Sequence, residues 1–104
     1  MKRGEVWWAD LPEPVGNRPV VILTRDSVLQ TIGGIVVTLV TRTVRHLPTE
    51  VVLGRRQGLP VSCVANLDNI LTVPRQRLKR LMGACDAGKI EELNQAIKAA
   101  LDVR

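Results

Sequence analysis

The chain has 104 residues, a length typical of one domain that buries its own core. Its net charge is +5, and its two cysteines are too few for a disulfide scaffold and are not spaced for zinc. No apolar run reaches the length of a membrane span, and the start lacks the apolar segment of a signal peptide, so we expect a cytoplasmic location.

The N-terminal part predicts three strands. Gly4–Leu11 forms the first, and Pro12–Asn17 makes a turn because two prolines and a glycine exclude regular structure. Arg18–Thr24 is an apolar, mostly β-branched run, which predicts a strand buried on both faces and paired antiparallel with the first. The pattern of Arg25–Thr31 is ambiguous, although Asp26 or Ser27 could cap one helical turn there, and Ile35–Thr41 predicts the third strand.

The C-terminal part predicts shorter elements. Glu50–Leu53 is a short strand ending at a glycine, and a basic turn follows it. Ser62–Leu67 predicts a strand that continues extended through Asp68–Val73. Pro74–Leu78 fits a short helix because proline is favoured at the first helical position, and Lys79–Cys85 predicts the last strand.

A final amphipathic helix is the clearest helical pattern in the chain. Asp86 is a good N-cap, and after it Ile90, Leu93, Ile97 and Leu101 recur at helical spacing. Many short strands and one helix indicate a single α+β domain over residues 1–104, built as a small, strongly bent antiparallel sheet or barrel.

Chemistry-bearing residues are few. The lone His46 and the scattered carboxylates make no metal-ligand cluster, and Cys63 lies in an apolar strand that would raise its pKa. Arg18 and Thr41 each stand at the end of a buried strand, where a guanidinium and a hydroxyl together suit a phosphate. The competing interpretation is an arginine bonded to a backbone carbonyl and a threonine that merely fits the sheet.

Ordered motifs along nearly the whole chain resemble the MazF/PemK toxins of type II toxin–antitoxin systems. The first are Gly4-Glu5-Val6-Trp7, Asp10-Leu11-Pro12 and Arg18-Pro19-Val20-Val21-Ile22-Leu23. The later ones are Thr38-Leu39-Val40-Thr41, Leu47-Pro48-Thr49-Glu50-Val51-Val52-Leu53, Gly58-Leu59, Val64-Ala65-Asn66-Leu67-Asp68-Asn69-Ile70, Arg77-Leu78 and Gly83.

This resemblance implies a homodimeric toxin with an SH3-like barrel, silenced by a cognate antitoxin. It implies cleavage of single-stranded RNA without metal or cofactor, by attack of the 2′-hydroxyl on its own phosphate. The family's catalytic positions fall on Arg18 and Thr41. One departure is the loop Pro12–Asn17, which is shorter than in many relatives and puts no carboxylate directly before Arg18.

Further RNA contacts are expected from basic and polar side chains near these strand ends. The candidates are Asn17, Arg42, Arg45, His46, Arg55, Arg56 and Arg77. His46 is also the available substitute for the missing acid–base group. Trp7 and Trp8 alternate on one strand, so we expect one in the core and the other at a dimer interface or stacked on a base.

Two other functions fit the same fold. One is a toxin that poisons DNA gyrase by protein contact, although the known relative of that kind ends in Trp-Gly-Ile and this chain ends in Asp102-Val103-Arg104. The other is a non-catalytic barrel that binds RNA with steep salt dependence and leaves it whole.

Overall fold

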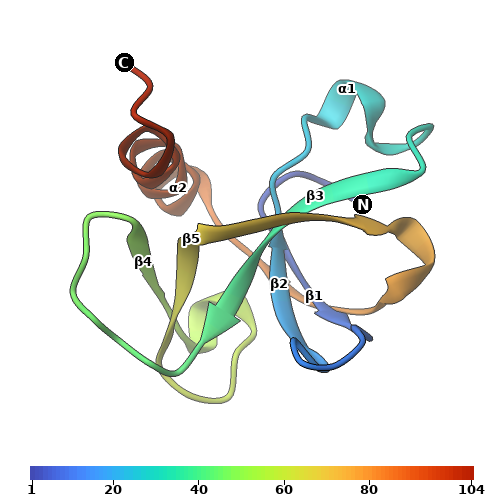
Figure 1. The fold of residues 1–104 in the computed structure, drawn as a ribbon, viewed down its shortest axis with the longest axis horizontal. Helices are drawn as coiled ribbons and strands as arrows, with labels where there is room; N and C mark the ends of the chain where they lie inside the picture. The colour runs from blue at the N-terminus through green and yellow to red at the C-terminus, as the bar shows by residue number, and fades with distance from the viewer.

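Six antiparallel strands form one curved sheet in the order β4-β5-β3-β2-β1-β6 (Figure 1). The computed structural model describes all of residues 1–104. The elements are β1 (Glu5–Ala9), β2 (Arg18–Ile22), α1 (Asp26–Leu29), β3 (Gly34–Thr41), β4 (Glu50–Leu53), the 3₁₀ turn η1 (Arg55–Gln57), β5 (Cys63–Pro74), the 3₁₀ turn η2 (Arg75–Arg77), β6 (Leu78–Ala84) and α2 (Ala87–Leu101). The predicted α+β class with a C-terminal helix is confirmed.

Strand β2 is the centre of the core, as its uninterrupted apolar sequence predicts. Val20, Val21 and Ile22 are all fully buried. Val21 packs in one cluster with side chains of α2, while Val20 and Ile22 belong to a second cluster that includes Leu29 of α1. The strand therefore separates two apolar layers, and its first residue, Arg18, stands where these layers end.

The sheet does not close into a hydrogen-bonded barrel, which corrects the barrel prediction. Strands β4 and β6 are its two edges, and the turn η1 after β4 packs against β6 instead of pairing with it. The approach is backbone to backbone, because a Cβ on Gly58 would overlap the Met82 carbonyl and a Cβ on Gly83 would overlap the Gln57 carbonyl. These two glycines thus allow η1 and the edge strand β6 to lie in close contact, although the edges of the sheet do not pair.

Strand β5 is longer than predicted because one strand spans the two extended segments. Its pairing with β3 shifts between Thr38, which faces Ile70, and Leu39, which faces Asn66. The intervening residues form a bulge that bends β5, and the Thr38 hydroxyl fixes it by donating to the Asn66 carbonyl at 2.6 Å. Before the bend β5 lies between β3 and β4, and after it β5 pairs with β3 alone (Figure 1).

The predicted helix over Pro74–Leu78 is wrong in extent. Pro74 is the last residue of β5, and only the 3₁₀ turn η2 separates it from β6. Proline is tolerated there because it faces Gly34, the first residue of β3, where a ladder hydrogen bond is not needed. The first two strands also end earlier than predicted, at Ala9 and Ile22.

Helix α2 packs on β4 and β5 through Leu93 and Ala96, which are buried (Figure 1). The predicted apolar stripe ends before Leu101, which is 59% exposed on the last helical turn. The predicted N-cap is confirmed, since the Asp86 carboxylate accepts from the Lys89 N–H at 2.9 Å. Neither helix combines the length and the apolar character needed to cross a bilayer.

Replacing Asp86 with alanine is expected to lower the free energy of unfolding by about 1 kcal/mol, because the Lys89 N–H then loses its acceptor. Urea titration followed by circular dichroism measures the change. Asp86→Asn is the matched control, since asparagine also caps and is expected to retain most of the stability. Equal losses in both variants would show that the cap does not stabilise α2.

Candidate functional site

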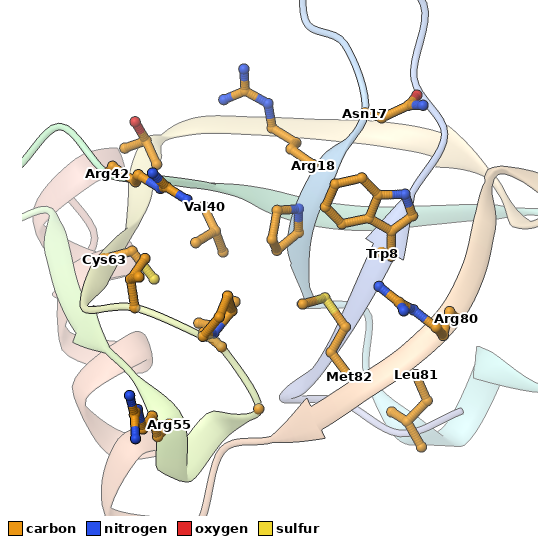
Figure 2. A pocket seen from close by; sticks show the side chains of 16 residues that line it. Trp8, Asn17, Arg18, Val40, Arg42, Arg55, Cys63, Arg80, Leu81 and Met82 are labelled. Carbon is orange, nitrogen blue, oxygen red and sulfur yellow. The ribbon is translucent and has the colours of Figure 1, made fainter.

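A cavity of about 970 Å³ opens at the end of the sheet where β2 begins and β3 ends (Figure 2). Its walls come from β1, β2, β3, β6, the start of β5 and the turn that follows η1. Apolar groups from Val40, Leu59 and Met82 line much of it. The polar side chains that line it are Asn17, Arg18, Thr41, Arg42, Arg55 and Arg80.

Arg18 and Thr41 meet at this cavity although 23 positions separate them in the chain. Strand β2 pairs with β3 so that Val20 faces Leu39, and the same register carried two residues outward sets Arg18 opposite Thr41. Directly opposed residues of antiparallel strands point to the same face. The pairing of two buried strands therefore places Arg18 and Thr41 at the same cavity.

The Arg18 guanidinium is held by the loop before it. Its Nε and Nη2 both donate to the Val15 carbonyl, at 3.2 and 2.8 Å. This is the carbonyl contact of the competing interpretation, but it occupies only one edge of the guanidinium. Nη1 donates to no protein group, so the side chain is oriented and still keeps a charged donor for a ligand.

The neighbouring polar groups are also left with free donors. Thr41 Oγ1 accepts from the Thr43 N–H at 3.2 Å, which orients the hydroxyl and leaves its hydrogen to donate. The Asn17 Oδ1 accepts from the Leu11 N–H at 3.1 Å, so its amide N–H groups remain unused. A set of donors with their acceptor atoms already occupied is suited to an anion.

No acidic side chain offsets the charge of this cavity. Its lining holds four arginines and no aspartate, glutamate or histidine. The one ion pair in the structure joins Lys89 and Glu92 on α2, so none of the four guanidinium groups is paired with a carboxylate. Unpaired guanidinium groups in a half-apolar hollow favour a phosphate-bearing ligand.

Family comparison agrees with this geometry. The family model for the PemK-like, MazF-like toxin of type II toxin–antitoxin systems matches residues 2–101. The chain belongs to this family. It is 41% identical over 101 residues to the probable endoribonuclease MazF2 of Mycobacterium tuberculosis, covering 96% of this chain and 97% of that protein. The endoribonuclease MazF of Staphylococcus saprophyticus is 31% identical, with 97% and 91% covered.

Solved structures of MazF-type toxins have the same fold. The Mycobacterium tuberculosis toxin MazF-mt6 superposes with a TM-score of 0.90 at 35% identity, covering 96% of this chain and 98% of that one. A mycobacterial endoribonuclease solved in complex with its cognate antitoxin gives a TM-score of 0.87 at 27% identity, covering 100% and 97%. The predicted MazF/PemK resemblance is thus confirmed.

Four of the residues predicted to contact RNA do not line the cavity. They are Arg45, His46, Arg56 and Arg77, all exposed. Arg45 and His46 lie on the loop between β3 and β4, where His46 adopts a positive φ of 56°. The imidazole therefore does not replace an acid–base group in the cavity, and RNA contact by these four side chains stays a prediction. Asn17, Arg42 and Arg55 do line the cavity.

The sequence analysis missed Arg80 and left the place of Trp8 open. Trp7 packs against the second apolar cluster, and its Nε1–H donates to Glu5 at 3.0 Å. Trp8 instead lines the cavity, with the Arg80 Cζ 6.0 Å from the centre of its ring. The pairing of β1 with β6 that brings them together contains two register shifts, which no local pattern in the sequence reveals.

Both cysteines of this chain are buried and free of disulfide bonds. Burial raises the pKa of Cys63, which lines the cavity, although the nearby Arg42 charge lowers it in part. Burial raises the pKa of Cys85 to about 11. The direction at Cys63 is the one that its apolar strand predicts, and a raised pKa disfavours the nucleophilic thiolate at both positions. No three His, Cys, Asp or Glu side chains gather closely enough to hold a metal ion.

Proposed function

We propose that this protein is an endoribonuclease toxin that cuts single-stranded RNA at short sequences, without a metal ion, in the cytoplasm. The observation that carries the proposal is the convergence of Arg18 and Thr41 in one cavity that holds arginines and no carboxylate. The curated relatives named endoribonucleases support the reaction class. A lining without carboxylate or imidazole offers no ligand set for Mg²⁺, which supports the absence of a metal from the reaction.

The reaction is a transfer of the phosphoryl group within the RNA. The 2′-hydroxyl attacks the adjacent phosphorus, the bond to the 5′-oxygen breaks, and the products are a 2′,3′-cyclic phosphate and a 5′-hydroxyl. Arg18 Nη1 stabilises the extra negative charge of the pentavalent intermediate, and the Thr41 hydroxyl donates to a phosphate oxygen. Guanidinium groups stay protonated in proteins, so solvent takes the 2′-hydroxyl proton and returns one to the leaving oxygen.

The proposed partners follow from the same cavity. The toxin works as a homodimer, and a cognate antitoxin silences it by laying an acidic segment over the four guanidinium groups. The charge supports this, since a carboxylate-rich peptide competes with RNA for arginines that have no partner within the protein. The complex of a related mycobacterial endoribonuclease with its antitoxin supports an antitoxin as the partner.

A cleavage assay tests the proposal directly. Purified protein is incubated with a mixed RNA pool in excess EDTA, and the cut sites and end groups are mapped. We expect fragments with 2′,3′-cyclic phosphate and 5′-hydroxyl ends at a recurring short sequence. RNA that is bound but left intact would point to the non-catalytic barrel. Activity lost in EDTA and restored by Mg²⁺, or ends bearing a 5′-phosphate, would contradict the proposed chemistry.

A further inference from the structure

The Trp8 indole is the one aromatic ring that lines the cavity. It is half-buried on β1, and its Nε1–H donates to no protein group, whereas that of Trp7 is bonded to Glu5. The core is already filled on both faces of β2 by aliphatic side chains and Trp7. Packing of the single chain thus leaves a flat, partly solvated ring in a cavity wall.

Arg80 faces this ring across a gap. Strand pairing sets Arg80 beside Trp8, and the guanidinium carbon lies 6.0 Å from the ring centroid (Figure 2). The exposed Arg80 side chain makes no hydrogen bond or ion pair, so nothing else in the protein holds it there. The 6.0 Å distance is somewhat less than twice the roughly 3.4 Å between stacked bases, so one base would fit between the ring and the guanidinium after a small outward movement of Arg80.

This gap lies next to the phosphate site. Trp8 faces Pro19 across the pairing of β1 with β2, and the next pair along the same strands is Ala9 with Arg18. Trp8 and Arg18 are therefore on adjacent strands and one position apart along them, and both line the same cavity. A single strand that places a phosphate at Arg18 can therefore bring a nearby base to Trp8 within the same cavity.

We propose that Trp8 and Arg80 form a base clamp, in which an unpaired nucleobase adjacent to the scissile phosphate is stacked between the indole and the guanidinium. The inference rests on the proposed endoribonuclease function and adds a subsite to it. Stacking accepts any base, so the clamp holds the strand in place and leaves the choice of sequence to hydrogen-bonding groups elsewhere. It also selects single strands, because a base within a duplex cannot enter the gap.

Fluorescence of Trp8 provides a readout that does not require cleavage. The chain has two tryptophans, so Trp7→Phe leaves Trp8 as the sole reporter. The probe is short 2′-O-methyl RNA of random sequence, which cannot undergo attack by the 2′-oxygen, compared with an abasic oligonucleotide of the same length. We expect quenching of Trp8 by the base-bearing probe and none by the abasic probe at equal occupancy, with occupancy measured by anisotropy of a labelled end.

Binding by Trp8 and Arg80 variants tests the same clamp without relying on the reporter. Trp8→Leu is expected to weaken binding of the base-bearing probe by roughly 5- to 150-fold, with Trp8→Phe losing less, and neither changes binding of the abasic probe. Arg80→Lys keeps the charge and loses the flat guanidinium. We expect it to weaken binding by roughly 2- to 5-fold with an unchanged dependence on salt.

The possible outcomes distinguish a failure of the base-clamp proposal from a failure of the endoribonuclease proposal. Cleavage of the RNA pool with equal quenching by both probes, or with none, overturns the clamp and leaves the nuclease standing. A Trp8→Leu protein that changes its sedimentation but binds the base-bearing probe normally places Trp8 at an interface between copies and also overturns the clamp. If no probe binds and no RNA is cut, the nuclease proposal fails and the clamp fails with it.

Discussion

Replacing Arg18 with alanine is expected to lower kcat/KM for RNA cleavage by at least about 10²-fold, the loss typical of removing one preorganised donor from a developing anion. Arg18 is the lining arginine that its own loop holds in place, through the Val15 carbonyl, while Nη1 stays free. Arg18→Lys restores the charge without the rigid fork, and we expect it to recover only part of the rate. Initial rates on an RNA carrying the mapped cut site measure the effect.

Two controls isolate the role of Arg18. Arg25→Ala removes the same charge from an exposed side chain outside the cavity and is expected to leave cleavage within about twofold, since distant exposed charges are largely screened. Thr41→Val removes the opposing hydroxyl, and the double variant with Arg18→Ala should be little slower than Arg18→Ala alone if both groups act on one phosphate. Full activity of folded Arg18→Ala protein would refute the catalytic assignment.

Gly58→Ala is expected to lower the free energy of unfolding by at least about 2 kcal/mol. Gly58 has φ of 88°, a left-handed conformation that costs about 1–2 kcal/mol in a residue with a Cβ. The new methyl group would also overlap the Met82 carbonyl of β6, which adds a backbone displacement costing about 1–3 kcal/mol. Urea unfolding at a fixed protein concentration measures the change.

Two further glycines separate the causes of that loss. Gly83→Ala also creates an overlap, here with the Gln57 carbonyl, but Gly83 does not have a positive φ. Its loss of unfolding free energy therefore measures the effect of the close approach alone. Gly33→Ala meets no atom within 4 Å and is expected to change stability by less than about 0.5 kcal/mol. If Gly58→Ala were as mild as Gly33→Ala, η1 and β6 would not be in firm contact.

Local sequence patterns were sufficient to predict the elements that depend on residues close together in the chain. The run from Arg18 predicts a buried strand because its apolar, β-branched residues have no polar face to expose, and β2 is that strand. That Arg18 and Thr41 line one cavity follows from the antiparallel pairing of β2 with β3, in which the start of one strand meets the end of the other. Asp86 was found because capping depends on residues three positions apart.

The features that the sequence did not predict depend on contacts between residues far apart in the chain. Trp8 meets Arg80 only through a pairing with two register shifts, and the bend of β5 depends on a bulge opposite Thr38. The close approach of Gly58 and Gly83 joins the end of η1 to strand β6, and no local hydrophobic pattern predicts it. Pro74 was misread because proline suits both the start of a helix and the end of a strand, and only the neighbouring β3 decides between them.

The four guanidinium groups without acidic partners have a consequence for the folded molecule itself. Like charges around one cavity repel one another, and no carboxylate in the protein offsets this repulsion. A polyanion that binds in the cavity reduces this repulsion. The melting temperature therefore rises with the fraction of the protein that is bound. The protein is therefore least stable when no ligand is bound, and a ligand that occupies the cavity and inhibits the protein also stabilises its fold.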